Sequence, residues 1–214
     1  MDYKDFSAMD WALMEKHLPN DYNFRQFKIF KKEKDKLICT KVNKIISDFQ
    51  DLKKILLKEE PAHAYISVCK FLNPHKVKAK PKNFKKAGYK FSQNIFLGAD
   101  LVIDVDTTNI FNRYKIIDLL RSHLCFKDIK VYETKHGFHI WVLDFQDYLN
   151  AFKQFEHPHE RENYNQEKRK EIADYLKKAG CKFDYPVSID TRRIVRLPYS
   201  IYGNELIIKN IPIF

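Results

Sequence analysis

The sequence predicts an α+β fold, with mixed sheets flanked by helices. Segments with the two-residue alternation of strands are interleaved with segments that have the apolar spacing of helices. Several pairs of neighbouring strand segments have hairpin spacing, and no internal repeat is present. This order favours α+β over a doubly wound parallel sheet. The 214 residues could form one larger domain or a domain with a small appendage; we expect a single domain over 1–214.

The first part of the chain alternates between helix and strand. Apolar residues at helical spacing predict a helix over residues 5–18, which ends at Pro19. The elements expected next are a strand over 23–31, an amphipathic helix over 43–57 and a strand over 62–68. Residues 76–86 contain six lysines and predict a solvated loop. That loop is either a phosphate-tracking arm or a flexible linker, and both interpretations stay open.

The second part begins with the apolar segment 99–106. The elements expected after it are a helix over 110–124, strands over 129–133 and 138–143, a helix over 160–178 that stops at Gly180, and strands within 187–197 and 205–209. The turn Thr134-Lys-His-Gly137 predicts that the strands before and after it form a hairpin.

The composition limits the classes of partner. The formal net charge is +11 and the pI is near 9.3, so polyanions such as nucleic acids are expected partners. A genome that encodes Lys-rich proteins would produce the same balance. No run approaches the roughly 20 apolar residues of a membrane span. No signal pattern opens the chain, so we expect a cytoplasmic, nucleoid-associated protein without membrane contact.

The cysteines do not indicate a metal site. The chain has four, which are scattered and form no Cys-x-x-Cys pair: Cys39, Cys69, Cys125 and Cys181. Structural zinc sites usually bring such pairs. We therefore expect reduced thiols and no zinc.

The segment Ala99-Asp-Leu-Val-Ile-Asp-Val-Asp106 ends in two carboxylates. On a strand, Asp104 and Asp106 share one face while Ile103 and Val105 take the other. Two close acids repel each other unless a cation lies between them. Hard ions such as Mg²⁺ or Mn²⁺ suit such an oxygen site. An acidic strand end that leads into a turn is the simpler alternative.

Gly137 and His139 form a second candidate feature. Glycine is rare, with five in the chain, so Gly137 indicates either a positive φ or a close approach of the backbone. His139 could donate a ring N–H to a phosphate oxygen, although a single strand histidine is more often structural.

The segment from Asp190 to Ser200 combines an acid with three arginines. Asp190 could be a third metal carboxylate, with Arg196 and Ser200 reaching a triphosphate, because the guanidinium fork suits phosphate. Arg192 and Arg193 point oppositely on a strand, so only one can face such a site. The alternative is a salt-bridged surface strand. Three carboxylates with two metals can activate a 3′-hydroxyl and stabilise a pyrophosphate leaving group.

These segments, in this order, resemble the catalytic small subunit of archaeal and eukaryotic DNA primase. That family shares Asp-x-Asp, then Ser-Gly-Arg-Gly-x-His, then an Asp followed by Arg-Leu-Pro and a small hydroxyl residue. The chain has Asp104-Val-Asp106, Thr134-Lys-His-Gly-Phe-His139 and Asp190 through Ser200. Flanking segments around 61–67, 97–103 and 126–132 are also similar, and the likeness spans about residues 24–210.

The resemblance implies an α+β primase/polymerase fold and template-dependent synthesis of RNA or DNA primers for DNA replication. It implies Asp104, Asp106 and Asp190 as catalytic ligands of Mg²⁺ or Mn²⁺. The nucleotide-binding residues that it implies are Thr134, Lys135, His136, Gly137, His139, Arg196 and Ser200. The implied partners are a DNA template and nucleoside triphosphates, and a primase large subunit stays open.

The chain also departs from the family pattern. Lys135 and His136 replace Gly and Arg, and either could supply the missing positive charge. The zinc-binding insertion after the first motif is absent, since residues 107–128 contain only Cys125. A lysine after the third motif is missing unless Lys209 replaces it. Two alternatives remain: a catalytically reduced relative that only binds nucleic acid, and a nuclease or other phosphotransferase with the same metal pair.

Overall fold

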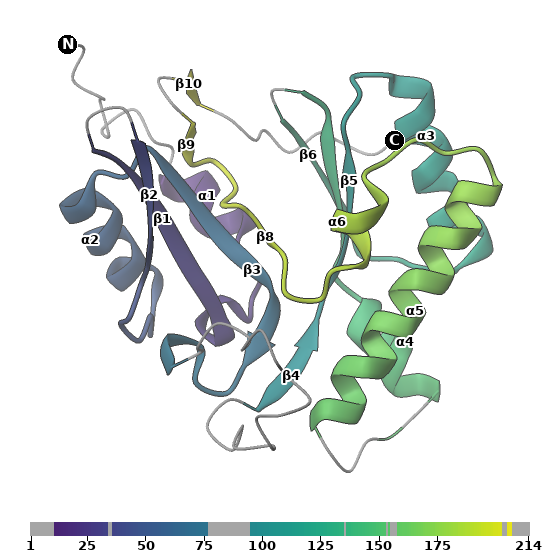
Figure 1. Ribbon diagram of the computed structural model, residues 1–214, viewed down its shortest axis with the longest axis horizontal. Helices are drawn as coiled ribbons and strands as arrows, with labels where there is room; N and C mark the ends of the chain where they lie inside the picture. The colour runs from purple at the N-terminus through teal and green to yellow at the C-terminus, as the bar shows by residue number, and fades with distance from the viewer. Residues whose placement is uncertain are drawn as a thin grey trace.

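The computed structural model describes residues 11–33, 36–76, 95–134, 136–152, 154, 158–202 and 205–206, which form two antiparallel sheets flanked by helices (Figure 1). The larger sheet contains β1 (Arg25–Glu33), β2 (Lys36–Lys41), β3 (His63–Phe71), β4 (Phe96–Ala99), β8 (Ile194–Arg196), β9 (Ile201–Tyr202) and β10 (Glu205–Leu206). The smaller sheet has the order β5 (Leu101–Val105), β7 (Phe138–Val142), β6 (Ile129–Glu133). The α+β prediction is confirmed.

The helices lie on the outer sides of the two sheets and between them. They are α1 (Trp11–His17), α2 (Phe49–Glu59), α3 (Ile110–Asp118), α4 (Phe145–Phe152), α5 (Pro158–Lys178) and α6 (Tyr185–Ile189). Figure 1 shows α2 beside the larger sheet, and α3, α4 and α5 beside the smaller one. Within the described ranges, no helix is both long and apolar enough to cross a bilayer.

β3 is the central strand of the larger sheet. It pairs with β1 along one edge and with β4, β8 and β9 in turn along the other. Tyr65 of β3 lies opposite Arg196 of β8. The segment with α6 and β8 passes between the two sheets in Figure 1, so it brings its side chains to both.

The two faces of the smaller sheet enter different cores. Val102, Tyr132 and Trp141 pack with the residues of the larger sheet, α1 and α2. Ile103 and Val105 point the other way and pack with residues of α3, α4 and α5. The alternation predicted for the acidic strand therefore holds in the structure, with the apolar neighbours of Asp104 fully buried on the far face.

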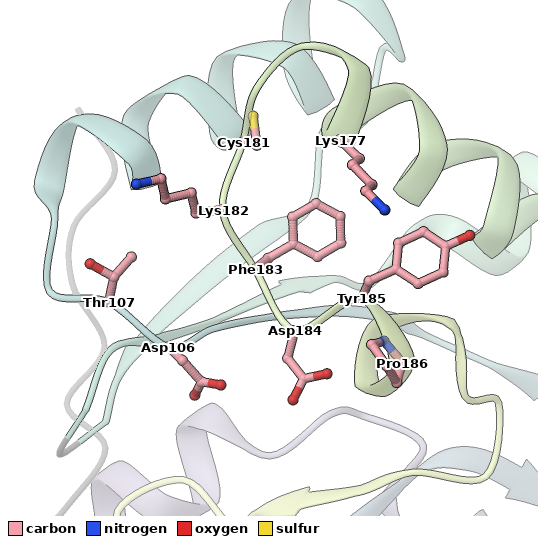
Figure 2. Close-up of a pocket in the computed structure, with 9 residues that line it drawn as sticks. All are labelled: Asp106, Thr107, Lys177, Cys181, Lys182, Phe183, Asp184, Tyr185 and Pro186. Carbon is pink, nitrogen blue, oxygen red and sulfur yellow. The ribbon is translucent and has the colours of Figure 1, made fainter.

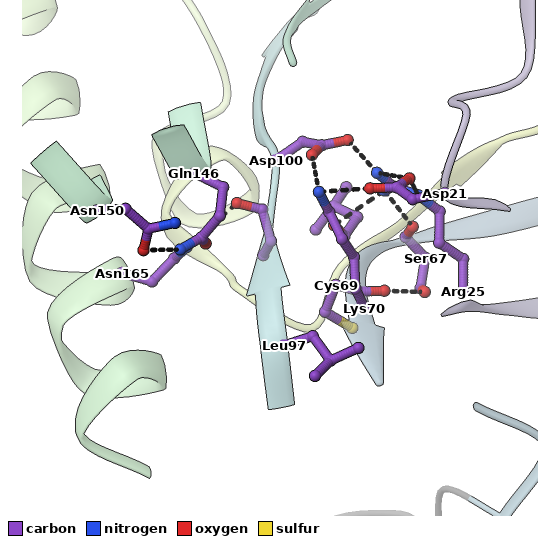
Figure 3. Close-up of polar contacts among 12 residues, drawn as sticks. Asp21, Arg25, Ser67, Cys69, Lys70, Leu97, Asp100, Gln146, Asn150 and Asn165 are labelled. Atoms are coloured by element: carbon purple, nitrogen blue, oxygen red, sulfur yellow. Dashed lines mark hydrogen bonds and ion pairs between the residues drawn. The ribbon is translucent and has the colours of Figure 1, made fainter. Parts of the chain in front are cut away.

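A buried polar cluster fixes the point where the chain passes from one sheet to the other (Figure 3). Arg25 of β1 donates a 2.6 Å hydrogen bond to Asp100, the residue that separates β4 from β5. Arg25 also donates to Asp21, and Lys70 forms ion pairs with both acids. A buried charge is tolerated when its partners surround it, as they do here. The expected strand 99–106 is thus divided in two at Asp100.

Several other expected boundaries change in the structure. α2 starts at Phe49 rather than 43, because the Asp48 side chain accepts the N–H of Asp51 and caps the helix there. The strand expected within 187–197 is present as the three-residue β8, and the end of the short helix α6 occupies the first residues of that range. β2 and α4 were not predicted. Residues 5–10 and 77–86 lie outside the described residues.

Candidate active site between the two sheets

Asp104 lies on β5, in a cavity of about 170 Å³ between the two sheets. The cavity is lined by Tyr65, Asp104, Asp106, Thr134, His136, His139, Arg193, Ile194, Val195 and Arg196. His139 on β7 is the direct cross-strand partner of Asp104, and its Nε2 lies 3.5 Å from Asp104 Oδ1. The structure therefore brings the first two predicted motifs together, and the segment 193–196 adds Arg193 and Arg196 from the third.

The environment of Asp104 favours its neutral form. Burial raises the pKa of this carboxyl to about 6, and repulsion by Asp106 and then Asp184 acts in the same direction. Arg193 and Arg196 partly oppose this rise. A carboxylate with a raised pKa beside two further acids marks a place where a bound cation would relieve repulsion.

His139 is neutral at physiological pH. Burial, followed by the positive charges of Arg196 and Arg193, lowers its pKa to about 4. A neutral imidazole has one N–H donor and one acceptor nitrogen. Its Nδ1 is buried and has no hydrogen-bond partner among the described residues. The ring can therefore donate one hydrogen bond within the site without adding a charge.

Asp184 is an acid of the site that we did not predict. Its backbone N–H donates a 2.7 Å hydrogen bond to the carbonyl oxygen of Asp104. The Ser188 hydroxyl joins the same two residues, because it accepts the N–H of Asp104 at 3.2 Å and donates to the Asp184 carbonyl at 2.8 Å. The Asp184 side chain caps α6 by accepting the Val187 N–H at 3.0 Å. Figure 2 shows the Asp106 and Asp184 carboxylates pointing to the same side.

The structure does not bring Asp190 to this cavity. Asp190 follows α6, is exposed, and its carboxylate accepts the backbone N–H of Arg192 at 2.9 Å. It lines neither of the two cavities that contain Asp106. A sequence pattern could have placed Asp184 at the start of a helix. The order Asp184-Tyr-Pro186 is typical of a capped helix start with an early proline.

The arginines of this segment divide between two roles. Arg193 and Arg196 line the cavity. Arg192 turns away and donates two hydrogen bonds, of 2.7 and 2.8 Å, to the carboxylate of Glu162 on α5. Of the adjacent pair, Arg193 therefore faces the site, in line with the expectation that only one could.

The turn between β6 and β7 packs against the end of the acidic strand. Thr134 donates its N–H to the Gly137 carbonyl at 2.8 Å, and Thr134 and His136 line the cavity. A Cβ on Gly137 would lie 1.7 Å from the Val105 carbonyl oxygen. Close approach of the backbone, rather than a positive φ, thus explains this glycine.

Besides Asp190 and Gly137, two predicted site residues are not seen at the cavity. Lys135 lies outside the described residues. Ser200 is buried, its N–H donates to the Leu197 carbonyl, and it is not part of the cavity lining. A contact between Ser200 and a nucleotide stays a prediction.

The donor atoms around Asp104 fit an open site for a hard cation. Carboxylate oxygens are the ligands that Mg²⁺ and Mn²⁺ prefer. Among the residues that the structure describes, no three His, Cys, Asp or Glu side chains form a ready metal cluster. Mg²⁺ commonly keeps several waters and binds through one or two carboxylates with substrate phosphates. The arrangement therefore suits a cation that arrives with a phosphate ligand.

Comparison with known proteins shows a distant similarity. No protein-family model matches the chain. The chain is similar to the DNA primase small subunit PriS of Pyrobaculum calidifontis, with 25% identity over 191 aligned residues. The match covers 78% of this chain and 52% of the relative, so the chain spans about half the length of the protein that it matches. The similarity supports a distant relationship to primase small subunits.

Proposed function

We propose that this chain is a primase-like nucleotidyltransferase that extends a nucleic-acid strand on a DNA template. The observation that carries the proposal is that Asp104 and Asp106 share a cavity with Arg193 and Arg196, while Asp184 lies next to Asp104. The distant similarity to a primase small subunit supports the same reaction class. A single catalytic domain over the chain is part of the proposal.

The acids of the site and its arginines would bind different parts of the substrate complex. Asp104 and Asp106 would hold the divalent cation, Mg²⁺ or Mn²⁺, together with the substrate phosphates, and Asp184 beside Asp104 would add negative charge. When bound, such a cation lowers the charge repulsion between the attacking oxygen and the phosphates. Arg193 and Arg196 neutralise the triphosphate, which their planar guanidinium groups can bind through paired hydrogen bonds. Neutral His139 and Thr134 offer hydrogen bonds to phosphate oxygens without a further charge.

The reaction transfers a nucleotidyl group. The 3′-hydroxyl oxygen of the growing strand forms a bond to the α-phosphorus of the nucleotide. The bond from that phosphorus to the bridging oxygen breaks, pyrophosphate leaves with the electron pair, and the hydroxyl proton passes to water. Arg193 and Arg196 stabilise the charge that develops on the leaving pyrophosphate.

Primer extension tests the proposal directly. The full chain is incubated with a primed DNA template, labelled nucleoside triphosphates and Mn²⁺. We expect template-coded products, and a fall of at least about 100-fold with Asp104→Asn, because the developing charge loses a cation ligand. Asp147→Asn, at an exposed acid on α4, is the matched control and should retain activity. No product from the wild-type chain, or equal activity of Asp104→Asn, would refute the proposal.

A catalytically reduced DNA-binding protein is the second candidate. It is favoured by the altered glycine loop, where Lys135 and His136 replace the Gly and Arg of the family motif. This candidate predicts salt-dependent binding of the primed template without any product. It also predicts that Asp104→Asn leaves binding unchanged in the presence of Mn²⁺ and nucleotide.

A further inference from the structure

Asp106 also lines a second, larger cavity (Figure 2). Its volume is about 610 Å³, within the range of cavities that hold nucleotide-sized ligands. Asp106 and Asp184 form one wall, and Lys177, Lys182, Phe183 and Tyr185 belong to the rest of the lining. Asp106 lines both cavities, so ligands in the two cavities would meet at the acids.

The side chains of the larger cavity combine positive charge with aromatic rings. Phe183 and Tyr185 have ring centroids 6.3 Å apart with planes tilted by 34°. The Lys177 ammonium lies 5.4 Å from the Tyr185 ring centroid, and the Tyr185 hydroxyl donates to Asp174 at 2.8 Å, which holds that ring in place. In Figure 2, Lys182 lies on the opposite side of Phe183 from Lys177.

This chemistry differs from that of the smaller cavity. The two guanidinium groups of Arg193 and Arg196 suit the dense charge of a triphosphate. Two lysines beside aromatic rings suit a strand that carries one charge per phosphate, because ammonium groups follow the backbone and rings contact bases. Both lysine side chains are exposed, so they can reach a backbone that extends into solvent.

We propose that the larger cavity receives the 3′-terminal nucleotide of the strand being extended. This inference rests on the proposed function and assigns its second substrate. The terminal base lies against Phe183 and Tyr185, Lys177 and Lys182 pair with the last phosphates, and the 3′-hydroxyl faces Asp106 and Asp184. The acids thus lie between the two substrates, where the new bond forms.

Photo-crosslinking tests the location of the strand end without requiring activity. A primed DNA template carries 5-iodouracil at the 3′-terminal position of the primer, and crosslinked peptides are identified by mass spectrometry. We expect the crosslink within residues 181–186, at Phe183 or Tyr185. A crosslink elsewhere in the chain would overturn the proposal.

A charge-matched pair of variants tests the lysines. Lys177→Glu with Lys182→Glu should weaken primer–template binding and raise the KM for the primer at least about tenfold, while the KM for the nucleotide changes less than about twofold. Lys170→Glu with Lys178→Glu changes two exposed lysines of α5 outside the cavity and has the same net charge. An equal loss in both double variants would show general electrostatic attraction and overturn the assignment.

The two proposals fail in different ways. A wild-type chain that makes no product but crosslinks within 181–186 would refute strand extension and retain the strand-binding cavity. A chain that extends primers but crosslinks elsewhere would retain the proposed function and refute this cavity as the primer site. Thermal melting of each variant confirms that the exchanged side chains leave the fold intact.

Discussion

The backbone N–H of Asp184 donates a 2.7 Å hydrogen bond to the carbonyl oxygen of Asp104 and so joins two acids from distant parts of the chain. The Ser188 hydroxyl closes the same connection by accepting the Asp104 N–H and donating to the Asp184 carbonyl. Ser188 is fully buried, and its own carbonyl accepts a hydrogen bond from the buried Arg169 of α5. The fold itself therefore holds two repelling acids side by side.

Ser188→Ala should weaken both the fold and the site. It removes the acceptor of the Asp104 N–H, and loss of a buried hydrogen bond costs about 1–3 kcal/mol of unfolding free energy. Mn²⁺ binding, followed by electron paramagnetic resonance, should weaken about tenfold because the Asp104–Asp184 spacing relaxes. Ser122→Ala, at an exposed hydroxyl that donates to Asp118, should change neither measurement. Unchanged Mn²⁺ affinity in Ser188→Ala would contradict this positioning role.

Two variants test which residue is the third acid of the site. Asp184→Asn tests the acid that the structure places beside Asp104, and Asp190→Asn tests the acid predicted from the sequence. Asparagine can still cap α6 at position 184 and can still accept the Arg192 N–H at 190, so both variants should fold. We expect Asp184→Asn to lose at least about 100-fold in primer extension, since it removes a carboxylate beside Asp106. Asp190→Asn should stay within about twofold of wild type. The reverse result would restore Asp190 as the third acid.

Asp104→Asn should stabilise the metal-free protein at neutral pH. The native pKa of this carboxyl is raised from 3.8 to about 6, so the folded state binds the proton more tightly than the unfolded state. The stability that this gives is present below pH 4 and is lost as the pH rises through about 6. At pH 7.5 the variant should therefore exceed wild type by up to about 3 kcal/mol, an advantage that disappears near pH 4.

Urea unfolding in the presence of a chelator at both pH values checks this prediction. The difference between variant and wild type is the useful quantity, because His139 contributes with the opposite sign. Its native pKa is lowered to about 4, so its stabilising contribution is present above pH 6.5 and lost as the pH falls towards 4. Added Mn²⁺ should raise the melting temperature of wild type but not of Asp104→Asn. A variant less stable than wild type at both pH values would contradict the argument.

Local patterns in the sequence were sufficient for the acidic strand and the hairpin. Alternation around Asp104 correctly placed Ile103 in the core, and the turn ending at Gly137 correctly joined two strands. Both features depend on neighbours within a few residues, which the sequence displays directly. The same holds for α5, whose end before Gly180 follows from a glycine with a positive φ.

The third acid depended on tertiary structure instead. Asp184 and Asp190 both precede arginines, and sequence spacing alone does not tell which one lies against β5. The backbone bond between Asp184 and Asp104, with the buried hydroxyl of Ser188, decides this. The division of the strand at Asp100 is similar, because it depends on Arg25 from a remote strand. The local periodicity of a sequence does not predict contacts between distant segments.

Gly137→Ala should disrupt the site through the backbone alone. The added methyl group would lie 1.7 Å from the Val105 carbonyl oxygen and 2.7 Å from the Thr107 nitrogen, and neither backbone atom can move aside like a side chain. The turn must then separate from the residues on either side of Asp106, which costs more than about 2 kcal/mol of unfolding free energy.

Gly180→Ala is the matched control. Gly180 has φ +78°, but its nearest contact would be 3.7 Å away, at the flexible end of Lys115. It should lose only the roughly 1 kcal/mol of a left-handed conformation. Because Asp106 lies in both cavities, Gly137→Ala should also weaken Mn²⁺ binding, whereas Gly180→Ala should not. Equal stability and equal Mn²⁺ affinity of the two variants would show that the turn does not hold the end of the acidic strand in place.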